Sequence, residues 1–313
     1  MAFIETYKQI MKDGYEKIIY SYDKTIGKYE YKPFSHANTD TWKEDFVEIL
    51  INNLLNYCYE PKELEILYNP NFPELKKYIN NSIKARLNKK TKQAQQDGLC
   101  GELLIDLILR MENINNETLI CRPKYQQLGA KAELKNYDVL MFREESDKNI
   151  TLVLGQVKTG KFDYCTDNLK EDLDTKYNES YFGNAICYIA DHRIADMPNI
   201  TLSNILSEFN NIALGAESTS VRNNKICEYI KNNNIKIEIP CLLLYGKDSV
   251  YSDIKKIKEN LDAEVELVKQ FFEKLSFNIY NFNFSISFYV FPSKSIIELR
   301  ESIMDYKVEV LNG

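Results

Sequence analysis

The sequence predicts an α/β protein in which a mixed sheet is flanked by helices and preceded by a helical N-terminal region. Two observations support this fold class. Amphipathic stretches alternate with short apolar runs along much of the 313 residues, and such alternation is typical of a layered α/β core. The composition, 44% hydrophobic and 27% charged, is that of a globular protein able to bury a sizeable core.

The N-terminal part of the chain reads as helical segments interrupted by prolines. Residues 41–60 and 72–93 both place apolar side chains at helical spacing. We therefore expect residues 1–95 to form a helical N-terminal region and residues 96–313 to form the α/β domain. No Gly/Ser linker marks the boundary between them.

The remaining elements are expected to alternate between helix and strand. The expected helices cover residues 97–113, 162–178, 221–234, 252–276 and 293–307. The expected strands cover residues 118–123, 132–142, 150–158, 184–191, 235–246 and 281–291. The last of these strands alternates almost strictly between apolar and polar residues, which indicates a strand with one buried face.

The charge of the chain is acidic overall, with one basic cluster. The formal net charge of −6 argues against an unselective polyanion binder, although it leaves room for a local basic groove. The second expected helix ends in five cations: Lys84, Arg86, Lys89, Lys90 and Lys92. These residues fit a solvated helix end favoured by the helix dipole. They also fit a contact with DNA phosphates, for which Lys89, Lys90 and Lys92 are the candidates.

The seven cysteines are scattered singly, without a C-x-x-C pair, and only two histidines accompany them. Zinc sites need clustered ligands, so this spacing argues against structural zinc. Scattered cysteines suit a reducing compartment, and we expect a cytoplasmic protein. The sequence shows neither a signal peptide nor an apolar run long enough to span a membrane.

The stretch LVLGQVKTG, residues 152–160, carries the candidate chemistry. Gln156 and Lys158 are two apart on a predicted strand, so both side chains point to the same face. Gly155 leaves room for another backbone or a ligand beside them. If the preceding charged hairpin pairs two strands antiparallel, Asp138 reaches the same end of the sheet, and Glu102 lies on a helix that packs on it.

These four residues together suit metal-assisted phosphodiester hydrolysis. Glu102, Asp138 and the oxygen of Gln156 are hard ligands of the kind that Mg²⁺ or Mn²⁺ prefers. A bound metal lowers the pKa of a water molecule and neutralises charge on the phosphodiester. Lys158 would then orient the attacking water or stabilise the pentavalent phosphate.

The same residues resemble the PD-(D/E)xK nuclease superfamily, whose restriction-endonuclease-like core is a mixed sheet flanked by helices. Gln156 stands where this superfamily most often has an acid, and a Q-x-K form occurs in Mrr-type restriction enzymes. A neutral ligand binds Mg²⁺ less tightly than a carboxylate. The order of segments GELLIDLILR, AELKNYDVLMF, LVLGQVKTG and IPCLLLYG is similar to the HamA family of Hachiman antiphage defence systems. This resemblance implies a DNA nuclease held inactive beside a helicase subunit, HamB.

Other interpretations remain open at this point. A degenerate nuclease fold that docks on DNA or on a partner protein without cutting, or a Mrr-like restriction endonuclease, would share these motifs. Glu102 could simply complement the dipole of its helix. Asp106 and Glu133 are further acids whose role is ambiguous, and His192 reads as structural or as facing nucleic acid. The glycine spacing of an ATP-binding P-loop is absent, so ATP chemistry would have to come from the partner.

Overall fold

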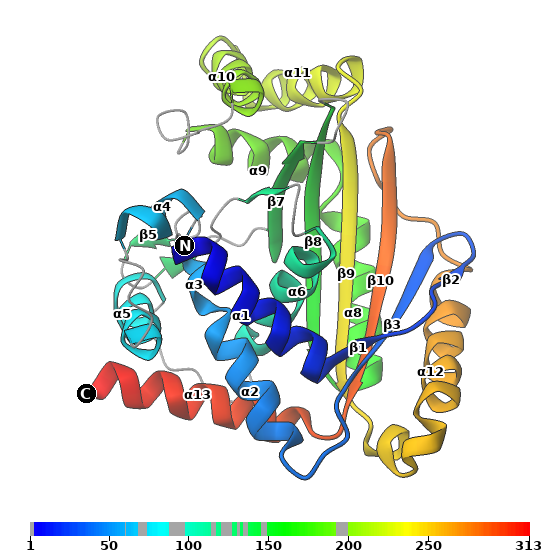
Figure 1. Cartoon of the computed structure of the whole chain (residues 1–313). Coiled ribbons are helices and arrows are strands. Elements are labelled where there is room, and N and C mark those ends of the chain that lie inside the picture. The colour runs from blue at the N-terminus through cyan, green and yellow to red at the C-terminus, as the bar shows by residue number, and fades with distance from the viewer. Residues whose placement is uncertain are drawn as a thin grey trace.

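The computed structural model describes residues 3–59, 61–67, 74–87, 98–113, 117–119, 127–129, 132–133, 137–144, 149–191 and 200–313. The strands in this part of the chain are β1 (Ile19–Ser21), β2 (Thr25–Ile26), β3 (Glu30–His36), β4 (Glu117–Leu119), β5 (Gln127–Gly129), β6 (Ala132–Glu133), β7 (Val139–Glu144), β8 (Ile150–Gly160), β9 (Lys236–Gly246) and β10 (Phe284–Ser293). The main sheet has the order β1-β3-β10-β9-β8-β7-β4, with β2 on β3, while β5 and β6 pair separately. The predicted α/β fold with a mixed sheet flanked by helices is confirmed (Figure 1).

Parallel pairing dominates the centre of the sheet. The strands β8, β9 and β10 are parallel neighbours, and β3 continues the parallel order beside β10. The strand β7 is antiparallel to β8, as the charged hairpin between them predicts. Central strands buried on both faces need long apolar runs, and residues 241–245 of β9 are all fully buried.

Helices cover both faces of the sheet (Figure 1). The helices are α1 (Phe3–Ile18), α2 (Trp42–Asn52), α3 (Leu54–Cys58), α4 (Pro61–Leu67), α5 (Leu75–Arg86), α6 (Leu99–Glu112), α8 (Phe162–Thr175), α9 (Glu179–Asp191), α10 (Ile200–Leu214), α11 (Thr219–Asn232), α12 (Ile257–Phe272) and α13 (Ile296–Asn312), with short 3-10 turns at η3 (Asp248–Tyr251) and η4 (Ile254–Lys256). Leu152 and Leu154 of β8 share a core with α8 and α12, whereas Val153 and Val157 share a core with α1, α2, α6 and α13. We call these two sides of the sheet the α8 face and the α6 face.

Gly155 lies at a close approach of two backbones. A Cβ atom at this position would lie 2.4 Å from the carbonyl oxygen of Pro240 on β9. The β8–β9 register skips these positions, resuming where Gln156 pairs with Cys241. Pro240 has no backbone N–H to donate, so the interruption of the β8–β9 pairing at this residue loses no hydrogen bond from it. The glycine predicted to leave room beside the site therefore accommodates the neighbouring strand.

One local prediction was wrong. Residues 184–191, expected as a strand, belong to helix α9. Phe182, Ala185 and Ile186 of α9 share the buried core of the α8 face with Phe209 of α10 and Ile226 of α11. A helix buried on several sides loses the polar stripe that would reveal its period. The N-terminal region contains α1 to α5, as expected for a helical region, and in addition the strands β1, β2 and β3.

The expected boundary between residues 95 and 96 lies outside the described residues. The first region nevertheless shares structure with the rest of the chain, because β3 pairs with β10 and residues of α1 and α2 enter the core of the α6 face. Among the described residues, six cysteines are free thiols and all are buried. They behave as small apolar side chains, as their scattered spacing predicts.

Candidate functional site

The β7–β8 pair brings Asp138 and Gln156 together. Val139 pairs with Gly155, so the preceding residue, Asp138, stands opposite Gln156 at the start of β7. The backbone N–H of Asp138 donates to the carbonyl of Gly155 at 3.0 Å, and the N–H of Val157 donates to Asp138 Oδ2 at 2.9 Å. The Asp138 carboxylate thus extends the hydrogen bonding between the two strands to the residue just before β7 and is held against the backbone of β8.

Gln156 and Lys158 face α8, because they alternate with Val157, which lies in the core of the α6 face. Lys158 Nζ forms an ion pair with Asp172 Oδ2 of α8 at 2.6 Å. The same carboxylate oxygen accepts from Lys176 Nζ at 3.0 Å, and Lys176 also donates to Gln156 Oε1 at 2.8 Å. The Asp172 carboxylate therefore binds both ammonium groups, and the amide oxygen of Gln156 binds that of Lys176.

This network is largely shielded from water. Gln156 is fully buried, and its Nε2 has no hydrogen-bond partner among the described residues. The side chains of Lys158, Asp172 and Lys176 are 13–19% exposed. Burial, reinforced by the carboxylates of Asp172 and Asp138, raises the pKa of Tyr181 to about 12. Both carboxylates therefore act on one tyrosine of α9.

Glu102 is placed differently from the other three predicted residues. It lies on α6, where a Cβ on the adjacent Gly101 would come within 2.6 Å of Val157 and 2.3 Å of Thr159. Helix α6 thus packs on the α6 face, opposite to the face that carries Gln156 and Lys158. The hydroxyl of Tyr57 donates a hydrogen bond to Glu102 Oε2.

The other acids considered from the sequence lie away from this network. Asp106 is buried in an ion pair with Arg110 at 2.7 Å and accepts from Asn53 at 2.9 Å, so it stabilises helix packing. Glu133 belongs to β6, which pairs with β5 outside the main sheet. His192 lies outside the described residues.

The predicted basic cluster is described only in part. Lys89, Lys90 and Lys92 lie outside the described residues, whereas Lys84 is exposed at the end of α5. Arg86 pairs with Glu63 at 3.3 Å and stacks on the ring of Tyr59. Arg86 thus takes part in the packing of α5.

The donor chemistry at this site suits a hard divalent cation. Asp138, Asp172 and the oxygen of Gln156 are oxygen donors on the α8 face, and the ammonium of Lys176 is a cation already held between two of them. No group of three or more histidine, cysteine, aspartate or glutamate side chains suited to a metal occurs in the described ranges. A metal here would therefore rest on two carboxylates and an amide, and Lys176 would have to withdraw.

Asp172, Lys176 and Tyr181 were not predicted from the sequence. Asp172 and Lys176 are spaced i,i+4, the spacing of a helical ion pair. The i,i+4 spacing indicates that the two side chains form an ion pair on one face of a helix. It does not indicate which strand of the sheet that face packs against.

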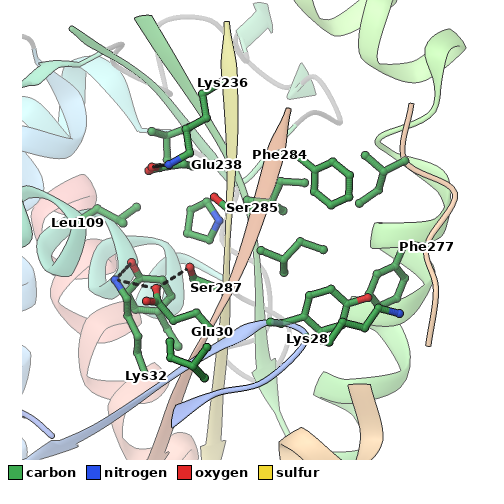
Figure 2. Close-up of a pocket in the computed structure, with 18 of the residues that line it drawn as sticks. Lys28, Glu30, Lys32, Leu109, Lys236, Glu238, Phe277, Phe284, Ser285 and Ser287 are labelled. Carbon is green, nitrogen blue, oxygen red and sulfur yellow. Dashed lines mark hydrogen bonds and ion pairs between the residues drawn. The ribbon is translucent and has the colours of Figure 1, made fainter. Parts of the chain in front are cut away.

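A separate pocket is lined by residues outside this network. It has a volume of about 900 Å³ and opens beside the amino ends of β9 and β10, so we call it the amino-end pocket (Figure 2). Most of its charged groups are paired with each other: Lys32 contacts Glu112 at 3.1 Å, and Glu238 accepts from both Lys236 and Arg143. Lys28 instead donates to the carbonyl of Leu275 and the hydroxyl of Ser276. The pocket therefore offers a ligand little charge that is not already neutralised.

Comparison with known proteins gives one result that bears on identity. The HamA family model matches residues 13–306, which is nearly the whole chain. A search of the curated proteins finds no match. Within the described ranges, every helix is too short or too polar to cross a membrane. The match covers both the N-terminal region and the α/β sheet, and the chain therefore belongs to the HamA family of Hachiman defence-associated proteins.

Proposed function

We propose that this protein is a metal-dependent DNA nuclease of a Hachiman antiphage defence system, acting in the cytoplasm and restrained by a helicase partner of the HamB type. One observation carries the proposal: in a member of the HamA family, Asp138 stands opposite Gln156, and Lys158 follows on the same face. That arrangement agrees with the pattern expected from the sequence, an aspartate beside a Q-x-K strand. The cleavage activity, the metal and the partner are all part of the proposal.

The residues of the chain divide the work as follows. Asp138, Gln156 and Asp172, which lie on the α8 face, would hold Mg²⁺ or Mn²⁺. Glu102, predicted as a further ligand, lies on α6 at the opposite face and is not part of this set. When bound, the ion neutralises charge on the phosphodiester and lowers the pKa of a water molecule. Lys158 directs its ammonium at the phosphate or at the attacking water. Asp172 holds Lys158 in place through the 2.6 Å ion pair.

The competing function is a nuclease-like module that binds DNA or a partner protein without cutting. It is favoured by a specific observation, because both reactive groups are engaged within the protein. Gln156 Oε1 accepts from Lys176, and Lys158 is bound to Asp172. In the nuclease proposal, the Lys176–Gln156 contact marks the restrained state and must open before DNA is cut, while the Asp172–Lys158 ion pair positions Lys158.

Nicking of supercoiled plasmid separates the two functions. Wild type, Lys158→Ala and the control Lys170→Ala are compared with Mg²⁺ or Mn²⁺, with and without the helicase partner. Lys170 is an exposed lysine of the same helix that carries Asp172, so the control removes a charge away from the network. The proposal expects nicking by wild type and Lys170→Ala and its loss in Lys158→Ala. Equal nicking by folded Lys158→Ala protein would contradict the proposed role of Lys158.

A further inference from the structure

The carboxyl ends of three parallel strands lie side by side at one end of the sheet. Gly160 of β8 pairs with Tyr245 of β9, and Gly246 of β9 pairs with Ser293 of β10. A pocket with a volume of about 750 Å³ opens there, and we call it the carboxyl-end pocket. Ser295, Ile296 and Ile297, where α13 begins, line this pocket, and Figure 1 shows α13 beginning at the end of the sheet where β10 ends. In open α/β sheets, ligands bind outside the carboxyl ends of the strands.

Two helices begin at this pocket from opposite faces of the sheet. Helix α8 follows β8 and packs on the α8 face, and α13 follows β10 and packs on the α6 face through Leu299 and Ile303. Lys161 is the N-cap of α8, and no described side chain caps this end. The first-turn N–H groups of a helix and its dipole favour an anion such as a phosphate.

Positive charge accompanies the helix ends. Lys161 is exposed at the pocket, and Arg300 lines it while donating to the carbonyl of Thr159 at 2.5 Å. Glu301 is the one acid among the described lining residues. The ammonium of Lys294, another lining residue, lies over the rings of Trp42 and Tyr251 and belongs to their packing.

Unused hydrogen-bonding capacity lies at the same strand ends. Thr159 lines the pocket and is 5% exposed, and its hydroxyl, which lies beside Gly101 of α6, has no hydrogen-bond partner among the described residues. The hydroxyl of Ser293, fully buried at the end of β10, is likewise without a partner in the described part of the chain. Buried hydroxyls are normally hydrogen-bonded, so these two strand ends keep hydrogen-bonding capacity that a bound water could use.

The pocket also has an apolar wall that is open to solvent. Tyr164 of α8 is 53% exposed and Ile297 of α13 is 58% exposed, and both line the pocket. A Cβ on Gly160 would lie 3.0 Å from the ring of Tyr164, so the ring lies over the end of β8. An exposed aromatic ring beside a lysine is the combination that binds single nucleotides of a strand, through stacking and phosphate contact.

We propose that the carboxyl-end pocket binds one nucleotide unit, with its phosphate at Lys161 and the start of α8 and its base against Tyr164. The inference deepens the proposed function, on which the choice of a DNA strand as the source of the nucleotide rests. A free mononucleotide offers the same phosphate and base, and the experiment distinguishes the two sources. Lys158 and Lys161 are three residues apart in the chain, so a DNA strand bound in the carboxyl-end pocket would pass beside the candidate site.

Binding is measured in EDTA, where no metal-dependent cleavage occurs, by the anisotropy of fluorescein-labelled single-stranded oligothymidine. Thymidine 5′-monophosphate is added as a competitor. Tyr164→Ala should weaken oligothymidine binding about 5- to 100-fold, as expected for loss of base stacking. Lys161→Gln should lower the slope of log affinity against log salt by about 0.7, the value for one phosphate contact on a single strand.

A substitution that fills the pocket gives an independent measurement. The nearest atom to a Cβ on Gly246 lies 3.9 Å away, an ordinary van der Waals distance, so Gly246→Leu adds a side chain to the pocket lining without a clash at its Cβ and should weaken binding about tenfold or more. Tyr20→Ala, at a tyrosine 44% exposed on β1, and Lys170→Gln, at an exposed lysine of α8, are the matched controls and should bind as wild type. Circular dichroism and thermal unfolding confirm that each variant folds.

The outcomes separate clearly. Weakened oligothymidine binding in all three pocket variants, without competition by the monophosphate, supports a DNA strand as the source. Competition that is lost in the same variants supports a free nucleotide. If wild type binds neither probe, or if folded Tyr164→Ala, Lys161→Gln and Gly246→Leu bind both probes as wild type does, the inference is overturned. Failure of the proposed nuclease activity would leave these metal-free measurements unchanged, so the two failures are distinguishable.

Discussion

In the proposed metal site, the ammonium of Lys176 lies between two of the oxygen ligands, and replacing Lys176 tests this arrangement directly. Its ammonium lies 2.8 Å from Gln156 Oε1 and 3.0 Å from Asp172 Oδ2, two of the oxygen donors of the candidate site. Lys176→Met keeps the length of the apolar stem but removes the charge. We expect this variant to bind Mn²⁺ more tightly than wild type, because the ion no longer competes with an internal cation.

The size of the effect follows from the contacts that metal binding would break. A hydrogen bond to a charged group contributes about 1.5–3 kcal/mol, and the Lys176–Gln156 contact is of this kind. The ion pair with Asp172 adds little to the difference, since Lys158 remains bound to the same oxygen. Each 1.4 kcal/mol corresponds to a factor of ten, so the dissociation constant should fall about 10- to 100-fold.

Titration calorimetry with Mn²⁺ measures this change without reference to cleavage. Lys170→Met, an equal change at an exposed position of α8, serves as the control and should bind Mn²⁺ as wild type does. Mn²⁺ binding that is unchanged or weaker in well-folded Lys176→Met would refute the reasoning, and Lys176 would then be a structural partner of Gln156 and Asp172.

Three further predictions concern single side chains. Asp138→Asn keeps an oxygen that can accept from Val157 but removes the charge, so plasmid nicking should be lost while the melting temperature stays near that of wild type. Gln156→Glu adds a negative charge beside the ion and should tighten Mn²⁺ binding about tenfold in calorimetry; equal affinities would show that residue 156 does not touch the metal. Burial lowers the pKa of His36 to about 4, and its neutral ring accepts from the N–H of Lys294. Since this folded-state pKa lies below the unfolded value of about 6.5, the stability is present above pH 6.5 and declines as the pH falls toward 4. Urea unfolding should show a contribution from His36 about 2 kcal/mol smaller at pH 5 than at pH 7, and this difference should be absent in His36→Gln.

The sequence predicts those contacts of the site that form between elements adjacent in the chain. Asp138 and Gln156 meet because one hairpin joins their strands, and residues two apart on β8 share a face whatever the rest of the chain does. Asp172 and Lys176 come from the next helix, and only the packing of α8 on β8 brings them to Gln156. A local pattern carries no information on that packing angle. The same limit explains residues 184–191, where an apolar run fits a buried strand and a buried helix equally well.

The distribution of charge explains how an acidic protein would hold DNA. The strand β8 extends beyond its pairing with β7, which spans Ile150 to Gly155 of β8, and Asp138 bonds the next free N–H at Val157. Lys158 projects from this extension to the α8 face, and Lys161 stands at its end beside the carboxyl-end pocket. Within about 10 Å of chain at the strand rise of about 3.3 Å per residue, a substrate strand would meet two cations, a helix N-terminus and an exposed aromatic ring. A net charge of −6 disfavours unselective binding of a polyanion, so the proposed binding of a nucleic acid strand depends on these local cations.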